Sequence, residues 1–151
     1  MTCAITNIGG TYSISTTAQN DDVTLSEAEG LSYTLVPGLI SHGPVGISTN
    51  MVSDPTWDDN LVCQSKGQSS GGTPTIEFRD VDSAGMDALI AAADPQNTDN
   101  YVHKLEWPDG SVLYWRGPIS GPEYSLGGPE DNQHVMFTGA NNQVPIKVAA
   151  S

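Results

Sequence analysis

The stretch Thr73–Pro95, TPTIEFRDVDSAGMDALIAAADP, changes its hydrophobic period halfway along. In the first half, Ile76 and Phe78 alternate with polar residues, as in a strand with one buried face. In the second half, apolar residues recur at three- and four-residue spacing, which predicts one apolar stripe on a helix at about residues 82–94. The members of this stripe are Met86, Leu89, Ile90 and Ala93.

The boundaries of this helix follow from its flanking residues. Asp80 or Asp82 can accept hydrogen bonds from the free N–H groups of the first turn, and Pro95 disfavours helical backbone in the residue before it. Burial contributes roughly 1.5–3 kcal/mol for each large side chain of the stripe, which stabilises a helix too short to persist alone. No second stretch matches this pattern, so the remainder is expected to form a sheet that the helix covers.

The composition is that of one acidic domain. At 151 residues the chain is long enough to bury a core without disulfides or metals. It carries 18 acidic residues against 5 basic ones, a net charge of −13, and no Lys or Arg precedes Lys66. A general surface for nucleic acid or for an anionic membrane is therefore disfavoured, although an acidic wall can keep DNA from adhering.

The cysteines and the N-terminus indicate a reducing compartment. Cys3 and Cys63 are far apart and form no CxxC motif, so two free thiols are favoured over a single disulfide. The first residues, MTCAITNIGG, lack the basic and apolar segments of a signal peptide, and no apolar run reaches the roughly 20 residues that cross a bilayer. We therefore expect a soluble protein made in a cytoplasm, with no membrane insertion.

The N-terminal quarter is predicted to contain early strands. Residues 3–8 and 11–17 are rich in Thr, Ile, Tyr and Ser, and residues 31–36 (LSYTLV) are also strand-like. The acidic residues 19–30 between them are expected to form an exposed connection.

Residues 39–72 are predicted to form an extended arm. They are rich in Gly, Pro, Ser, Asn and Asp, yet they also carry large apolar residues that a disordered linker lacks. Loops longer than about 12–15 residues in a compact domain are usually functional. The sequence therefore favours an arm that packs on a neighbouring subunit over a hairpin folded onto its own domain. The expected apolar anchors are Met51, Trp57, Leu61 and Val62.

The residues after the helix predict five short strands. Pro108-Asp109-Gly110 is a strong hairpin signal between two strand-like segments, residues 101–107 and 111–117. Further strands are predicted at residues 123–126, 134–138 and 144–148. With about eight short strands and one helix, the fold class is mainly β. We predict a single domain over residues 1–151, a β-sandwich or small barrel with one flanking helix.

Motifs for catalysis or cofactor binding are absent from the sequence. The chain lacks GxSxG, HExxH, a Walker loop and a GxGxxG after a strand, so we predict no enzyme activity, no catalytic residues and no cofactor. For the scattered histidines His42, His103 and His134, packing is favoured over catalysis or metal binding. A pair between Cys63 and a histidine is disfavoured, because nothing in the sequence brings the two together.

Two clusters of Asp and Asn offer the hard oxygen ligands that Ca²⁺ prefers. They are Asp94, Asn97 and Asp99, and Asp54, Asp58 and Asp59. Neither has the spacing of a calcium loop, so polar turns are favoured and no metal site is predicted.

Aromatic residues gather near the predicted hairpin, among them Trp107, Tyr114 and Trp115. A face that stacks on sugars is conceivable, but cross-strand packing is the commoner use of such residues.

Three glutamates, Glu77, Glu106 and Glu123, lie in predicted strands and are expected to point away from the apolar face. Charged rows on a sheet usually indicate simple solvation. The alternative is that these side chains line a water-filled channel in an assembly.

The order of these features resembles the tail tube (major tail) proteins of long-tailed bacteriophages. The matching features begin with an apolar-bearing arm after Val36-Pro37-Gly38, a Gly-rich approach at residues 67–75, a strand and an Asp-capped helix. A hairpin with a Pro-Asp-Gly turn follows, and then strands on either side of Thr138-Gly139. The similarity extends over about residues 30–148 and rests on the order of motifs that are each weak alone.

The resemblance implies a structural virion protein that forms hexameric rings stacked into a tube, through which DNA reaches the host. Sheets of neighbouring subunits would join into an inner barrel, and long loops would reach adjacent rings. The implied partners are further copies of the chain and other tail proteins, such as the tape measure, tail terminator and distal tail protein. DNA would pass through the lumen without specific binding, and the protein would belong to the virion tail after assembly in the bacterial cytoplasm. Glu77, Glu106 and Glu123 are then candidates for the lumen face.

Other classes of function stay open at this point. One is the related tube protein of contractile secretion machines, whose rings would carry effector proteins rather than DNA. Another is a monomeric β-sandwich module that binds carbohydrate through Trp107, Tyr114 and Trp115, and a third is a calcium-dependent adhesion domain. The modules predict a monomer that responds to glycans or to chelators, whereas the tube protein predicts stacked rings.

Overall fold

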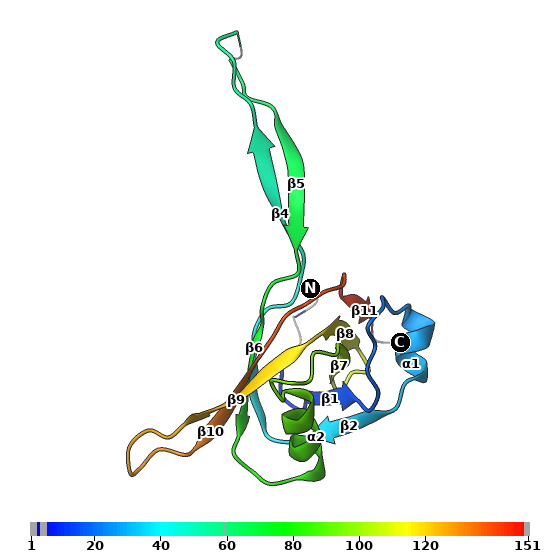
Figure 1. Ribbon diagram of the computed structural model, residues 1–151, viewed down its shortest axis with the longest axis vertical. Helices are drawn as coiled ribbons and strands as arrows, with labels where there is room; N and C mark the ends of the chain where they lie inside the picture. Colours follow the sequence, from blue (N-terminus) through cyan, green and yellow to red (C-terminus); the bar gives the residue numbers. More distant parts are fainter. Residues whose placement is uncertain (1–2, 4–5, 59, 150–151) are drawn as a thin grey trace.

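The computed structural model describes residues 3, 6–58 and 60–149, and it consists of a β-sandwich body with a long hairpin projecting from it (Figure 1). The first sheet, sheet A, has the strand order β11 (Ile146–Val148), β8 (Val112–Gly117), β7 (Tyr101–Glu106), β1 (Thr11–Ser15) and β2 (Tyr33–Val36). The second, sheet B, has the order β3 (Leu39–His42), β6 (Thr75–Arg79), β10 (His134–Gly139) and β9 (Ile119–Ser125). Neighbouring strands in both sheets are antiparallel. The predicted mainly-β sandwich is therefore confirmed.

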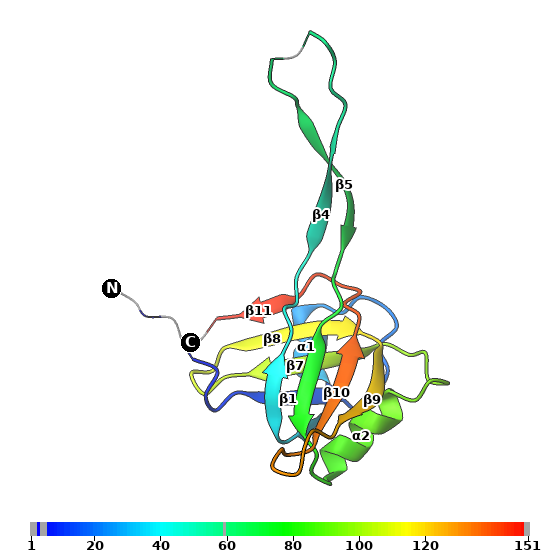
Figure 2. The ribbon, with the colours of Figure 1, turned by 90° about the vertical axis from the view of Figure 1, so that its left-hand side faces the viewer.

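The core lies between the two sheets, whose strands cross at a steep angle (Figure 2). Ile76 and Phe78 of β6 are buried there, while Thr75 and Arg79 on the other face of the strand are exposed. The predicted alternation is thus confirmed. Tyr12 and Ile14 of sheet A, and Val135 and Phe137 of sheet B, complete the centre of the core.

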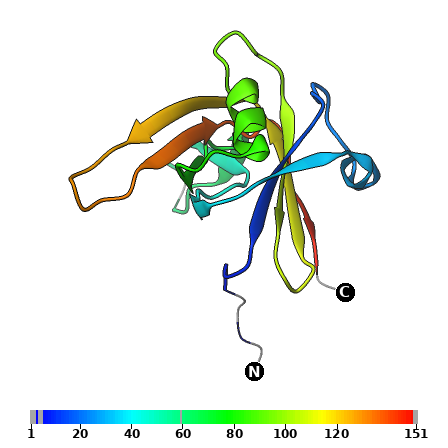
Figure 3. The ribbon, with the colours of Figure 1, turned by 90° about the horizontal axis from the view of Figure 1, so that it is seen from below.

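Helix α2 (Ala84–Ala92) is the predicted helix, but it is shorter than expected. Its N-cap is Ser83, whose Oγ accepts a hydrogen bond from the Met86 N–H at 3.0 Å, so the predicted aspartate cap is wrong. Ser83 prevails because it directly precedes the first helical residue. Met86 and Leu89 of the predicted stripe are buried, and α2 packs on β2, β1 and β9 at one end of the sandwich (Figure 3).

A second helix, α1 (Leu25–Gly30), lies where an exposed connection was predicted. Thr24 caps it: the Thr24 Oγ1 accepts from the Glu27 N–H at 3.3 Å and lies 3.3 Å from the Glu27 carboxylate. This is the Ser/Thr-x-x-Glu capping pattern, which the prediction overlooked. Ala28 of α1 packs with Val102 and Tyr114 on the face of sheet A opposite the core.

The remaining strand predictions are mostly confirmed. The Pro108-Asp109-Gly110 hairpin joins β7 to β8, and the Gly110 N–H donates to the Trp107 carbonyl at 2.9 Å. The strand predicted at residues 123–126 is the second half of a longer β9. The strand predicted at residues 3–8 is wrong where it is described, because residues 7–9 form a bend and turn; residues 4 and 5 lie outside the described part.

The predicted arm, residues 39–72, is divided between the body and the projection. Its first four residues form β3, an edge strand of sheet B, so they do not belong to the arm. The projection is a two-stranded ribbon of β4 (Ser48–Ser53) and β5 (Gln64–Ser70) (Figures 1 and 2). We call residues 44–72 the arm from here on. In the described residues, no helix has the length and apolar character needed to cross a membrane.

Candidate assembly surfaces

The arm exposes apolar side chains along its whole length. Trp57 is fully exposed at the tip, Leu61 is 88% exposed and Met51 59%, while Val62 is exposed to a smaller extent. Within the described residues, β4 and β5 pair only with each other. β5 itself is polar, so the exposed apolar residues lie on β4 and at the tip. A projection that exposes large apolar residues without a core of its own is typical of a surface that contacts another protein.

The outer face of sheet B brings two of the predicted glutamates together. Strand register places Ser41, Glu77, Met136 and Glu123 in one row across the sheet, on the face opposite the core. The Glu77 Oε1 lies 2.7 Å from His134 Nδ1, and the Ser41 hydroxyl lies 3.5 Å from the other Glu77 oxygen. Arg79 is exposed on this face as well, so the row is polar rather than uniformly acidic.

Glu106, the third predicted glutamate, lies on the other sheet. It ends β7, on the face of sheet A that carries α1, and its carboxylate is 3.5 Å from the Lys104 ammonium. The sequence showed that all three glutamates occupy polar strand positions. It did not show that they belong to two sheets.

Both edges of sheet B are free in the described structure. β3 pairs only with β6, and β9 pairs only with β10. Because the sheet has four antiparallel strands, its two edge strands run in opposite directions. Unpaired edges are surfaces to which another chain can add a strand.

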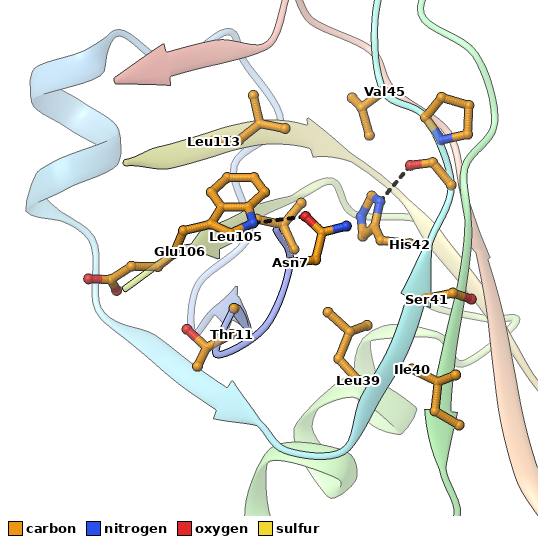
Figure 4. A pocket seen from close by; sticks show the side chains of 14 residues that line it. Asn7, Thr11, Leu39, Ile40, Ser41, His42, Val45, Leu105, Glu106 and Leu113 are labelled. Atoms are coloured by element: carbon orange, nitrogen blue, oxygen red, sulfur yellow. Dashed lines mark hydrogen bonds between the residues drawn. The ribbon is translucent and has the colours of Figure 1, made fainter. Parts of the chain in front are cut away.

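A cavity of about 280 Å³ opens beside β3, at the end of the sandwich away from α2 (Figure 4). Its apolar wall consists of Leu39, Val45, Leu105, Trp107 and Leu113. Asn7 adds a polar group, and its Oδ1 accepts from the Trp107 Nε1–H at 3.1 Å. The sequence contained no signal for this cavity, because its lining comes from four segments of the chain.

Two of the histidines are structural groups of the core. The His103 Nε2–H donates to the Gly117 carbonyl at 3.2 Å, and its Nδ1 accepts from the Tyr12 hydroxyl. The Trp115 indole N–H donates to His42 Nε2 at 3.2 Å, so His42 carries its proton on Nδ1, towards the Gly43 carbonyl. Burial lowers the pKa of His103 to about 3 and also lowers the pKa of His42. Packing roles are thus confirmed for both.

The base of the arm is polar. Arg116 is buried there, donates to the Asp22 carboxylate at 2.9 Å and also contacts the Gln143 side chain. A second cavity, of about 540 Å³, opens next to it and is lined by Asn141, whose buried Nδ2 has no hydrogen-bond partner in the described structure. Arg116 therefore joins the loop before α1 to the loop before β11.

The residues proposed for sugar binding do not form a platform. Tyr114 and Trp115 are both buried, and as consecutive strand residues they point to opposite faces of sheet A. Among the described residues, no group of three or more His, Cys, Asp or Glu side chains is arranged to hold a metal. Asp59 of the second Asp/Asn cluster, for which polar turns are favoured over calcium binding, lies outside the described part.

The fold is that of solved tail and tube structures. The tail of an empty gene transfer agent particle, with C6 symmetry, superimposes with a TM-score of 0.64 at 10% identity, over 97% of this chain and all of that one. A chain of the anti-feeding prophage baseplate superimposes with a TM-score of 0.68 at 7% identity, over 100% of this chain and 99% of that one. The SPP1 tail tube superimposes with a TM-score of 0.64 at 14% identity, over 95% of this chain and 78% of that one.

At the level of sequence, no family model and no curated protein matches. The likeness therefore lies in the fold: a two-sheet sandwich with a flanking helix, in the class that includes the SPP1 tail tube and the gene transfer agent tail.

Proposed function

We propose that this chain is a structural virion protein that polymerises as stacked hexameric rings into a bacteriophage tail tube. The observation that carries the proposal is the combination of a tail-tube fold with a sandwich that has two free edges and an apolar arm. None of these features suits a monomer, because each leaves backbone groups or apolar side chains exposed.

The ring closes in this proposal through sheet B. The free edge of β9 in one copy pairs with the free edge of β3 in the next, and the two strands run antiparallel because they are opposite edges of a four-stranded antiparallel sheet. The contact joins two different surfaces, so it can repeat from copy to copy, and it closes a ring when the rotation per copy divides a full turn. The six-fold symmetry of the gene transfer agent tail supports six copies.

The arm joins one ring to the next. A strand advances about 3.3 Å per residue, so the roughly ten residues from Ser48 to Trp57 span about 30 Å. A compact body of about 120 residues has a radius of gyration of about 14 Å, which makes the arm about as long as a neighbouring body is wide. Met51, Trp57, Leu61 and Val62 are its apolar anchors.

The arm is tested by substitution within the full-length chain. Replacing the four anchors by Ser is expected to leave a folded body that no longer stacks, because the apolar area lost is the area that the next ring would bury. The matched control replaces four polar arm residues, Ser48, Ser53, Ser65 and Ser69, by Ala. Deletion of residues 45–68 removes the anchors together with Val45 and should also prevent stacking, and tubes formed by the deletion variant would contradict the arm assignment.

The outer face of sheet B lines the lumen in this proposal, with Glu77 and Glu123 facing the DNA. Arg79 shares this face with the two glutamates, so the wall lacks the excess of basic groups that binds the phosphate backbone, and DNA slides past it. A small maleimide–gold cluster on Glu123→Cys, with Cys3 and Cys63 replaced by Ser, is expected to appear inside the tube in electron micrographs. The same label on Glu106→Cys should appear in the wall or outside, and the reverse pattern would show that sheet A lines the lumen.

The remaining partners follow from the role. The tube would be met at its ends by the tail terminator and distal tail proteins, would enclose the tape measure before ejection, and would assemble in the bacterial cytoplasm. No step of this role requires catalysis, a cofactor or a metal.

The tube protein of a contractile secretion machine, with protein rather than DNA as its cargo, is the second candidate, and the likeness to a baseplate chain of the anti-feeding prophage is the reason to keep it. The two roles share the ring and differ in cargo. Purified particles that contain nuclease-protected DNA would support the phage tail tube, whereas particles with protein cargo alone would support the second.

Negative-stain electron microscopy of the purified chain, with sedimentation of the same sample, tests the assembly itself. Stacked rings or hollow tubes are expected. A monomer that binds glycans, or that melts at a lower temperature with a chelator, would overturn the proposal in favour of a binding module.

A further inference from the structure

The β9–β10 hairpin extends beyond the body, as Figures 1 and 3 show, and apolar side chains at the end of β9 are exposed. Tyr124 is paired with Val135, and directly opposite residues of an antiparallel pair point to the same face, so Tyr124 lies on the core side of sheet B. Val135 is buried, yet Tyr124 is 55% exposed and Leu126, just past the strand end, is 59% exposed. The side of sheet B that faces the core therefore carries apolar residues beyond the buried part of the molecule.

At the opposite edge of sheet B, beside β3, the core is incomplete and leaves an open cavity. Helix α2 closes the sandwich at the β9 side, while the cavity of about 280 Å³ is left open at the β3 side. Leu39 and His42 of β3 are paired with Phe78 and Ile76, so they too lie on the core side. In Figure 4, Leu39 and Val45 point towards the cavity from one side, and Leu113 and Leu105 line it from sheet A.

We propose that this cavity is a socket for the β9–β10 hairpin of the next copy in the ring, with Tyr124 of that copy as the inserted side chain. The proposal rests on the ring described above. If β9 of one copy pairs with β3 of its neighbour, residues on the core side of β9 come to lie on the same side as Leu39 and His42. Tyr124 is then carried over the cavity, and Leu126 follows at its rim.

The chemistry of the cavity fits a phenol. A cavity of about 150 Å³ can hold benzene, so about 280 Å³ has room for the tyrosine ring. A buried tyrosine hydroxyl needs a hydrogen-bond partner, and the Asn7 amide in the cavity lining can supply one. Tyrosine is also among the residue types enriched at the positions that contribute most to binding energy in protein interfaces.

The socket differs from the arm in what it joins. The arm connects rings along the tube, whereas the socket connects neighbours within one ring and so acts before stacking. Loss of the socket is therefore expected to leave monomers, and loss of the arm to leave unstacked rings.

Site-specific photocrosslinking tests the proposal in the full-length chain. p-Benzoylphenylalanine replaces Tyr124, tubes are verified by electron microscopy, and crosslinks are mapped by mass spectrometry in a mixture of ¹⁵N-labelled and unlabelled protein. We expect crosslinks between copies, from position 124 to residues 39–45 or 105–113. The control probe at Glu123, on the opposite face of the same strand, should reach the outer face of the neighbouring β3 near Ser41 but none of residues 105–113, so crosslinks to residues 105–113 are the diagnostic ones.

The outcomes separate this inference from the proposed function. Tubes whose position-124 crosslinks map elsewhere, or only within one copy, would overturn the socket and leave the tube intact. A chain that stays monomeric under every condition would overturn both.

A substitution series measures the contribution of the inserted side chain. Tyr124→Ala is expected to weaken ring formation at least tenfold, and Tyr124→Phe to retain most of it, because the ring fills the cavity and the hydroxyl adds one hydrogen bond. Val45→Trp, which fills the cavity from its own side, should weaken assembly as Tyr124→Ala does. Thermal unfolding of the monomer should be unchanged in the Tyr124 variants, and equal assembly by all four proteins, wild type included, would overturn the proposal.

Discussion

Single residues in the core combine polar groups with close packing. His103 stacks on Trp115, with ring centroids 3.9 Å apart, while both of its ring nitrogens are hydrogen-bonded. His42 reaches the same cluster from sheet B through the Trp115 indole. Each imidazole has one donating and one accepting nitrogen, which is the neutral form, so these contacts hold only while both rings are uncharged.

The buried histidines predict that the body loses stability in mild acid. The unfolded chain takes up a proton near pH 6.5, whereas burial lowers the pKa of His103 in the folded chain to about 3 and also lowers that of His42. Between these values the unfolded state binds more protons, so stability falls as the pH falls, by about 1.4 kcal/mol per pH unit for His103 alone. Urea unfolding followed by tryptophan fluorescence at pH 7, 6 and 5 measures the slope.

His103→Gln provides the comparison for this experiment, because its amide can donate to the Gly117 carbonyl and accept from Tyr12 without titrating. The variant is expected to be less stable at pH 7 but to show a flatter slope between pH 7 and 5. Thr75→Ala, an exposed substitution on sheet B, should keep the wild-type slope. An equal slope in His103→Gln would show that other groups cause the acid sensitivity.

Elements of the body are positioned by close backbone contacts as well as by apolar stripes. Helix α2 lies against β2 at Gly85, where an added Cβ would be 1.8 Å from the Leu35 carbonyl oxygen. Glycine in a helix is ordinarily unfavourable relative to alanine, so its presence here reflects the closeness of the strand.

Gly85→Ala is therefore predicted to destabilise the body, against the usual effect of alanine in a helix. A loss of at least about 2 kcal/mol is expected, because the helix must move away from β2 and uncover Met86 and Leu89. Gly30→Ala in α1 is the matched control, since an added Cβ meets nothing within 4 Å there. The control should be neutral or stabilising by less than about 1 kcal/mol, and similar melting temperatures for both variants would contradict the contact.

The whole molecule has surfaces that a single copy does not use: two sheet edges, an apolar arm and an open end of the core. It also carries a net charge of −13, which opposes the approach of identical copies. In the proposed tube, attraction between copies must therefore come from strand pairing and apolar burial, which act at contact. The repulsion acts at longer range and is screened by salt.

Salt is accordingly predicted to promote assembly. Raising NaCl from about 0.05 M to about 0.5 M shortens the screening length several-fold, so the fraction of protein that sediments as rings or tubes should rise. Glu29→Gln combined with Glu130→Gln removes two exposed acidic charges, so the same sedimenting fraction should be reached at a lower NaCl concentration. Assembly that weakens as salt is added would show that ion pairs, rather than apolar contacts, hold the subunits together.

Much of the body was predictable from local pattern. The period change at Thr73–Pro95 identified β6 and α2, and Pro108-Asp109-Gly110 identified the β7–β8 hairpin, because each feature depends on neighbouring residues in the chain. Helix α1 was missed although Thr24 and Glu27 form a recognisable cap, since the short acidic segment has no long apolar stripe.

The candidate site was predictable only in part. The sequence indicated that residues 39–72 contain an apolar projection and that Glu77 and Glu123 occupy polar strand positions. The grouping of Glu77 with Glu123, away from Glu106, depends on strand order, which no local pattern encodes.

The sequence by itself therefore determined the mainly-β class, the flanking helix, the acidic surface and the apolar character of the arm, because composition and periodicity act over short stretches of chain. The tertiary structure alone decided which strands became edges, where the core stayed open, and that Tyr124 lies at one end of a sheet whose other end has the cavity. These relations join residues far apart in sequence, such as Leu39 and Tyr124, and they arise only when long-range strand pairing and side-chain packing bring distant segments together.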